Sequence, residues 1–152
     1  MRAGLALSLG LVLVAAGWED AHKREIADWK SIAIVAVAPV WWWANGATIW
    51  PGAALQIGMA TATFALFAML FHFGVMGGGD VKLITALSLW LPPFAFLDML
   101  FVMSVAGGVV TAAMLVQRRL ERREGQVEVP YGIAIAAAGL LSLHTPILNQ
   151  FG

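Results

Sequence analysis

Hydrophobic residues fill six stretches of the chain, and the charged residues between them are gathered in short groups. Asp, Glu, Lys and Arg are absent from 31–79 and from 129–152, and Asp98 is the one such residue in 83–117. A membrane-spanning helix needs about 20 apolar residues. The pattern therefore predicts an all-α polytopic membrane protein with about six transmembrane helices. Cutting the chain at charged groups and at Pro or Gly breaks gives the segments 3–17, 30–44, 51–73, 81–91, 94–116 and 131–147.

The first segment also resembles a secretory signal peptide, because Val14-Ala15-Ala16 could serve as a small-residue cleavage site. Only Arg2 precedes the apolar run, whereas more positive charge follows it. Since Lys and Arg favour the cytoplasmic side of a membrane, this distribution favours a retained helix that enters from outside.

Lys and Arg predict the orientation of the whole chain. Eight of the nine fall in alternate connections, which the positive-inside rule assigns to the cytoplasm. Both termini are then extracytoplasmic, and the uncharged turns 45–48 and 91–94 lie outside. All seven tryptophans fall at segment ends, where indole rings prefer the headgroup layer. The eight cytoplasmic residues are Lys23, Arg24, Lys30, Lys82, Arg118, Arg119, Arg122 and Arg123.

The fourth segment is too short to cross a membrane alone. Asp80 to Leu91 is 12 residues, or about 18 Å of helix at 1.5 Å per residue, against a hydrocarbon core of about 30 Å. We expect either the glycines before it to dip into the membrane or neighbouring helices to shield it. Both arrangements place Asp80 near the cytoplasmic interface, where an ionisable residue is a functional candidate.

Composition narrows the classes of function. The 152 residues are 61% hydrophobic and 12% charged, and nine basic residues balance nine acidic ones. A net charge of zero removes the electrostatic argument for a nucleic-acid partner. The chain has no cysteine, which excludes disulfides, cysteine nucleophiles and thiolate zinc sites.

Two aspartates are the strongest candidates for chemistry. Asp20 is at the cytoplasmic end of the first predicted helix, just after the apolar segment 3–17, and Asp80 is at the cytoplasmic start of the fourth, just before 81–91, so both are expected at the cytoplasmic level. Two carboxyl groups in close approach share one proton, because the pKa of one is driven up. The ionised carboxylate can then take a proton from water while the protonated one polarises a scissile carbonyl. This chemistry requires neither a metal nor a cofactor.

Three glycines precede Asp80. Gly77, Gly78 and Gly79 have no side chains to obstruct a substrate backbone, and glycine permits backbone angles that other residues avoid. The alternative interpretation is structural: glycine is common in turns between membrane helices, and Asp is a common helix N-cap.

The run Gly77-Gly78-Gly79-Asp80-Val81-Lys82-Leu83 resembles the G-x-G-D-x-K-L signature of the type IV prepilin peptidases. Around Asp20, the order of Asp, basic residues and Ile26 is similar to the family's first aspartate motif, although Ala27-Asp28 stands where Pro-Asn is common. Val129-Pro130-Tyr131-Gly132 is similar to its hydrophobic-Pro-Tyr/Phe-Gly element.

The resemblance implies one membrane-embedded aspartic peptidase domain over 1–152, in the inner membrane. Its catalytic residues would be Asp20 and Asp80, with Gly77, Gly78, Gly79 and Lys82 shaping the site or binding substrate. The substrate would be a prepilin leader peptide, cut on the cytoplasmic side after a glycine. Without the cysteines of longer members, the chain resembles the peptidase-only form linked to Flp or tight-adherence pili, for which methylation is not expected.

Other polar residues have weaker claims. Lys82 is either a substrate contact or an interfacial anchor, and its place about 200° around the helix from Asp80 argues against an ion pair between them. His22 is expected to be an exposed loop residue, His72 a packed interfacial one, and Asp98 a helix cap near the outer turn. Glu19, Glu25 and Asp28 form an acidic group that could attract a basic leader.

Two rival functions stay open from sequence. One is an intramembrane protease of the presenilin or signal-peptide-peptidase kind, which shares the Gly-x-Gly-Asp element but usually has its first aspartate inside a span. The other is a non-enzymatic transporter or assembly subunit, which would use Asp80 for ion coupling or packing and would tolerate loss of Asp20.

Overall fold

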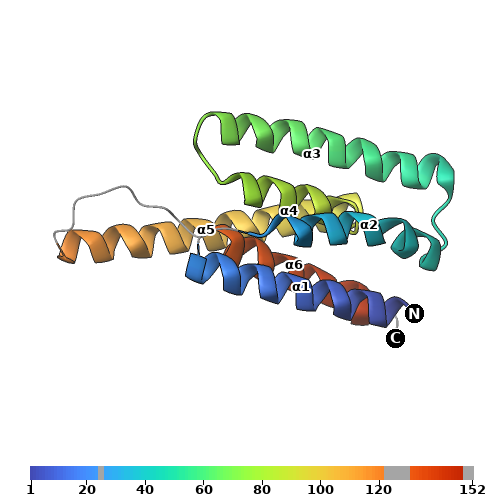
Figure 1. Cartoon of the computed structure of the whole chain (residues 1–152), viewed down its shortest axis with the longest axis horizontal. Helices are drawn as coiled ribbons and strands as arrows, with labels where there is room; N and C mark the ends of the chain where they lie inside the picture. The colour runs from blue at the N-terminus through green and yellow to red at the C-terminus, as the bar shows by residue number, and fades with distance from the viewer. Residues whose placement is uncertain (24–25, 122–130, 149–152) are drawn as a thin grey trace.

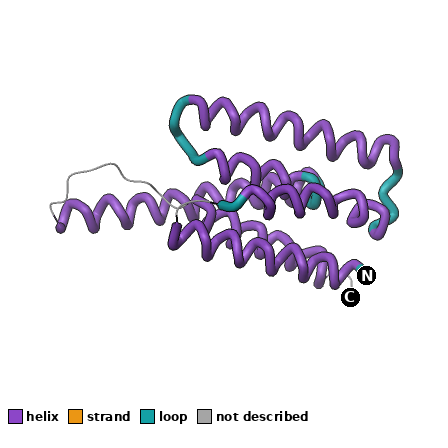
Figure 2. The backbone as a smooth tube through the Cα atoms, in the orientation of Figure 1, coloured by secondary structure: helices purple, strands orange, loops and turns teal. Residues whose placement is uncertain are grey.

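The computed structural model describes residues 1–23, 26–121 and 131–148. Helices and connecting turns account for all of this part of the chain, and it contains no strand (Figure 2). The prediction of an all-α fold is therefore confirmed for the described residues. The elements are α1 (Arg2–Lys23), α2 (Asp28–Ala44), the single π-helical turn η1 (Ile49–Ala53), α3 (Ala54–His72), α4 (Gly78–Ser88), α5 (Pro93–Glu121) and α6 (Tyr131–Leu148).

Each predicted apolar segment corresponds to one helix, but two helices run on past the apolar residues. Helix α1 continues to Lys23 and α5 to Glu121, so charged residues occupy helix ends where loops were expected. In α1, Lys23 Nζ lies 3.5 Å from Glu19 Oε1 one turn earlier, a spacing that supports a helix. Asp20 lies in the last turns of α1, at the end of the first helix as expected.

Three helical stretches are long and apolar enough to cross a membrane: Arg2–Lys23, Ile49–His72 and Pro93–Met114. The chain is thus a membrane protein by the character of its helices. A crossing by α2, α4 and α6 stays a prediction. Helix α1 begins at the end of the bundle where α6 ends (Figure 1), as a chain with both termini on one side requires.

Helix α4 is the centre of the bundle. It contacts α2, α3, α5 and α6, and Leu83, Ile84, Ala86, Leu87 and Ser88 have no exposed surface. Helix α1 packs instead along α6, and α6 also lies against α5 (Figure 1). The expectation that neighbours shield the short fourth segment is therefore confirmed.

Tryptophans close the far end of α4. Trp41 Nε1 donates to the Trp90 carbonyl oxygen at 3.0 Å, and Trp42 Nε1 donates to that of Leu89. Trp90 is buried and donates to the Ile34 carbonyl oxygen at 2.9 Å. Because the last carbonyls of a helix lack intrahelical donors, the Trp41 and Trp42 indoles supply donors just past the end of α4. The Trp90 indole instead joins this end of α4 to the middle of α2. Trp18, Trp29, Trp43 and Trp50 are exposed, as interfacial anchors would be.

Candidate active site

Asp80 is held by the first turn of its own helix. Gly77 is the N-cap of α4 in an extended conformation, and Asp80 is the third residue of the helix. Its carboxylate accepts a hydrogen bond from the Gly77 backbone N–H, which is the reciprocal half of a capping box. Asp80 is buried, with 7% of its surface exposed. Its position in the first turn follows from the local sequence, whereas its burial comes from the packing of α4 among its neighbours.

The glycines before Asp80 contribute space rather than unusual backbone angles. Gly77 has φ −75° and ψ 149°, which any residue can adopt, and Gly78 and Gly79 are helical. A Cβ on Gly77 would lie 3.2 Å from Asp80 Oδ2, and one on Gly79 would lie 3.2 Å from the Ile26 Cβ. The structure thus agrees with the expectation that these glycines leave space beside Asp80. It does not agree with the expectation that they adopt backbone angles that other residues avoid.

Asp20 reaches the same place from α1. It is buried, with 6% of its surface exposed. The residue before it, Glu19, ties this end of α1 to α2: Lys30 Nζ donates to Glu19 Oε2 and also to the Ala15 carbonyl oxygen at 2.9 Å. The Ala27 N–H donates to Glu19 Oε2 at 3.3 Å. The Lys30 side chain is 6% exposed, so this ion pair fixes the turn that carries Asp20.

Asp20 and Asp80 line one cavity of about 320 Å³. This aspartate cavity also has Ile26 and Asp28 on its wall, together with Gly77, Gly78 and Gly79. We refer to Gly77, Gly78 and Gly79 as the glycine turn, and all three line this cavity. Of the six residues proposed from sequence, five meet here, and Lys82 does not.

The electrostatics of the cavity distinguish its two buried carboxyl groups. Asp80 lies outside the three membrane-length helices, and its pKa is raised to about 7 by burial, which disfavours the charged form, and by the negative charge of Asp20. The Gly77 N–H opposes this shift without cancelling it. Near neutral pH the pair can therefore hold a single proton, the state that acid–base chemistry on a peptide bond requires.

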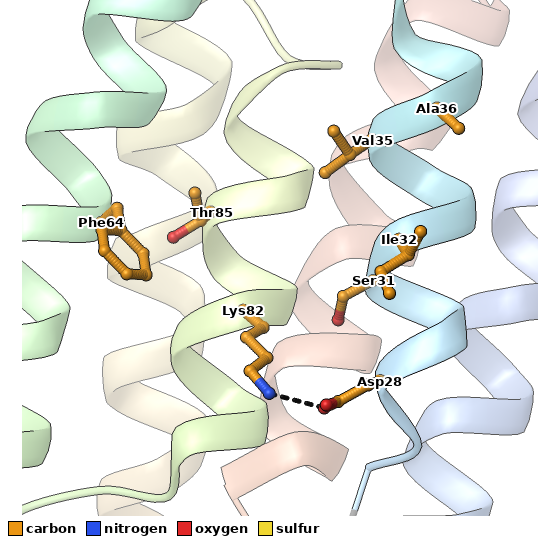
Figure 3. Close-up of a pocket in the computed structure, with 8 residues that line it drawn as sticks. All are labelled: Asp28, Ser31, Ile32, Val35, Ala36, Phe64, Lys82 and Thr85. Atoms are coloured by element: carbon orange, nitrogen blue, oxygen red, sulfur yellow. Dashed lines mark hydrogen bonds and ion pairs between the residues drawn. The ribbon is translucent and has the colours of Figure 1, made fainter.

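Lys82 does not line the aspartate cavity and pairs with Asp28. Its Nζ lies 2.7 Å from Asp28 Oδ1, and both side chains are about half exposed or more (Figure 3). The pair stands at one end of an apolar groove of about 400 Å³ between α2, α3 and α4. The expectation that Lys82 does not pair with Asp80 agrees with this geometry. Sequence reasoning missed its partner, because Asp28 is 54 residues away.

The weaker candidates do not line the aspartate cavity. His22 is exposed in the last turn of α1, with its ring 4.4 Å from that of Trp18, so the loop assignment is wrong and the exposure is right. His72 is exposed at the end of α3, which contradicts a packed position. Asp98 is exposed and is the sixth residue of α5, too far into the helix to cap it.

The predicted acidic group is not a free negative surface. Glu19 is engaged by Lys30 and Lys23, and Asp28 is engaged by Lys82. Glu25 lies outside the described residues. Within the described ranges, no three His, Cys, Asp or Glu side chains gather in a group suited to a metal ion.

A family model described as the type IV leader peptidase family matches residues 7–112, more than half of the chain. The chain belongs to the type IV leader peptidase family. The match includes Asp20, Asp80 and the glycine turn, and it ends within α5, before α6 begins. Membership makes the protein a peptidase of the leader-peptidase type, with leader peptides as its general class of substrate. Comparisons with curated proteins and with solved structures found no match.

Proposed function

We propose that this leader peptidase is a membrane aspartic endopeptidase that removes the leader of a prepilin, or of a prepilin-like protein, on the cytoplasmic side. The observation that carries the proposal is that Asp20 of α1 and Asp80 of α4 line one small cavity beside a glycine turn. Family membership supports a leader-peptide substrate, and the two carboxyl groups supply chemistry that can hydrolyse a peptide bond.

In this mechanism Asp80 starts protonated and Asp20 ionised. Asp20 takes a proton from water as the water oxygen attacks the scissile carbonyl carbon, and Asp80 donates its proton to the carbonyl oxygen. The tetrahedral intermediate then collapses. The proton on Asp20 passes to the leaving nitrogen, the C–N bond breaks, and Asp80 recovers its proton from the intermediate. Both carboxyl groups return to their starting states, and one water is consumed.

The glycine turn is the proposed seat of the substrate backbone. Gly77 is exposed, while Gly78 and Gly79 are partly exposed, and all three border the cavity that holds the carboxyl groups. A peptide can approach such a wall closely because no Cβ projects from it. Lys82 then shapes the site through Asp28, which borders the same cavity, rather than by binding the peptide itself.

We further propose that residues 1–152 form one membrane-embedded unit whose aspartate cavity faces the cytoplasm from the inner membrane. The distribution of Lys and Arg supports this orientation. The burial of α4 among its neighbours supports a crossing in which this short helix never meets lipid alone.

Co-expression with a Flp-type prepilin tests the proposal, with leader removal followed by the change in pilin size on a gel. Asp20→Asn and Asp80→Asn keep the shape of each side chain but remove its acid–base function, so each should lower the cleavage rate at least 100-fold. Asp98→Asn is the matched control, because Asp98 is exposed and outside the cavity. Cleavage retained in Asp80→Asn would rule out the dyad.

A further inference from the structure

Gly132, the second residue of α6, lies directly against Asp20. A Cβ built on Gly132 would stand 2.7 Å from both Asp20 Cγ and Oδ2, and 2.8 Å from the Asp20 Cβ. Carbon atoms in contact prefer about 3.5–4.0 Å, so no side chain fits at this position while Asp20 keeps its place. Among the described glycines, this is the tightest approach to another residue.

Neither partner can move away easily. Asp20 is buried on a short side chain, and Gly132 is buried at the start of a helix. One turn along, a Cβ on Gly17 of α1 would lie 3.0 Å from the Ala136 Cβ of α6. On the other side, the Tyr131 ring fills the space over Gly107 of α5, where a Cβ would lie 2.9 Å from Cε1. The first turn of α6 is thus clamped between α1 and α5.

The place of this contact in α6 also suits a carboxylate. The first four backbone N–H groups of a helix have no intrahelical acceptor, and the helix dipole favours negative charge at its N-terminus. Helix α6 begins at Tyr131, so Asp20 lies beside its first turn.

We propose that Gly132 is a positioning residue, which sets the orientation of the Asp20 carboxylate toward the water that it activates. The inference rests on the proposed function. It also gives a role to the Tyr131-Gly132 part of the Pro-Tyr-Gly element, which lies beyond the family match at residues 7–112. A methyl group at residue 132 would displace the carboxylate rather than the clamped helix.

Purified protein in nanodiscs, assayed over a range of prepilin concentrations, tests this role. For Gly132→Ala we expect kcat to fall about 10- to 100-fold, because a displacement of about 1 Å in a catalytic group can lower the rate 100-fold. KM should stay within about twofold, since the substrate backbone is seated elsewhere. The upper limb of the pH–rate profile should also move, because the separation of the two carboxyl groups sets how strongly they interact.

Two glycines provide matched controls. Gly139→Ala adds a methyl to the same α1–α6 interface, but it meets the movable end of Leu13, at 3.0 Å from Cδ1. Gly108→Ala in α5 enters open space. Both should keep kcat within about twofold of wild type. Normal kcat in Gly132→Ala would overturn the inference while leaving the proposed function intact.

A second measurement does not depend on activity. In a thermal-unfolding cycle, Gly132→Ala should lower Tm by several degrees in the wild-type background, and by clearly less in Asp20→Gly, which lacks the Cβ and carboxyl group that collide with the methyl. Equal Tm losses in both backgrounds would show that Gly132 does not act through Asp20. If wild type fails to cleave prepilin, the proposed function fails, and this cycle still decides whether the contact exists.

Discussion

Asp20 and Asp80 share a cavity, but different parts of the molecule hold them. Asp80 is fixed locally: the N-cap of its own helix donates to it from three residues earlier. Asp20 is fixed remotely, by Gly132 of α6 and by the Glu19–Lys30 pair that joins α1 to α2. A short sequence motif therefore positions the Asp80 carboxyl group, whereas packing between helices that are distant in sequence positions the Asp20 carboxyl group.

The surroundings of Asp80 set its protonation state, whereas the surroundings of Asp20 set the orientation of its carboxylate. The burial of Asp80 raises its pKa toward neutrality and makes it the natural holder of the proton. Contacts with α6 leave Asp20 little freedom to turn, which suits a base that must face a water molecule. Changes near Asp80 should therefore act mainly on the pH profile. Changes near Asp20 should act mainly on the rate, and should move the pH profile only where they also change the separation of the two carboxyl groups, as Gly132→Ala does.

The largest expected stability effect concerns the charge on Asp80. Its pKa rises from 3.8 to about 7 on folding, so between these values the folded state binds the proton more tightly than the unfolded state. The free energy of unfolding then falls as pH rises through this window, by up to about 4 kcal/mol at 1.36 kcal/mol per pKa unit. Asp80→Asn should raise Tm at pH 8 and flatten this pH dependence, as thermal unfolding in detergent can show.

The pH dependence of the cleavage rate tests the same protonation of Asp80. Because the proposed mechanism needs a proton on Asp80, the cleavage rate should decline as pH rises above about 7. An Asp98→Asn variant should keep both the decline and the wild-type Tm profile, since Asp98 is exposed. A rate that keeps rising to pH 9 would assign the proton to a different group.

Sequence was sufficient to predict the all-α class and the approximate place of each described helix, because hydropathy reports burial in lipid or protein directly. It misplaced helix ends, since charged residues such as Glu19 and Lys23 stabilise a helix one turn apart as readily as they fill a loop. It placed His72 in a packed site that the fold does not form, because an isolated polar residue in an apolar segment has no pattern that shows which way it faces.

The candidate site was predictable where its contacts are local. Asp80 and its glycines form one continuous motif, so their place at the start of one helix was predictable. The structural alternative, with Asp80 as the N-cap, is wrong, because Gly77 is the N-cap and Asp80 is the third residue of α4. The contact between Asp20 and Gly132 joins residues more than 100 positions apart, and the Asp28–Lys82 pair joins two helices. Such contacts depend on helix packing, which residue spacing along one chain does not encode.

A further prediction concerns the Glu19–Lys30 pair, which holds the turn that carries Asp20. Lys30→Met would leave Glu19 with only its contacts to Lys23 and to the Ala27 N–H. We expect a lower Tm, because the buried Lys30 ammonium joins α2 to α1 through Glu19 and the Ala15 carbonyl oxygen. Cleavage should slow at every pH, because the turn that carries Asp20 loosens.

The exposed pair is the control for the buried one. Lys82→Met removes a partner whose side chain is 48% exposed, and exposed ion pairs contribute about 0–1 kcal/mol. Its Tm should therefore change little. Equal losses of Tm in Lys30→Met and Lys82→Met would show that burial of the Glu19–Lys30 pair does not matter for this end of α1.

The smallest expected effects lie within the glycine turn, and they differ between neighbouring residues. Alanine at Gly77 or Gly79 brings a Cβ to 3.2 Å from Asp80 Oδ2 or from the Ile26 Cβ, so the neighbour must shift by a few tenths of an ångström. We expect cleavage to slow about three- to tenfold in each variant, equivalent to about 1 kcal/mol in the barrier. Gly77→Ala should also move the upper limb of the pH–rate profile, because it disturbs the acceptor of the Gly77 N–H.

Gly78→Ala tests whether the turn needs glycine only to leave space for neighbouring protein side chains or also to let the peptide approach. Its Cβ would meet the Phe71 ring at 3.4 Å, an ordinary contact with an exposed ring that can move, and alanine is favoured over glycine in helices by up to about 1 kcal/mol. If the peptide backbone lies against all three glycines, as proposed, Gly78→Ala should slow cleavage about as much as Gly77→Ala and Gly79→Ala do, while Tm holds or rises. A wild-type cleavage rate in Gly78→Ala would remove residue 78 from the proposed substrate seat. Gly77 and Gly79 would then be needed only for the space that they leave around Asp80 and Ile26.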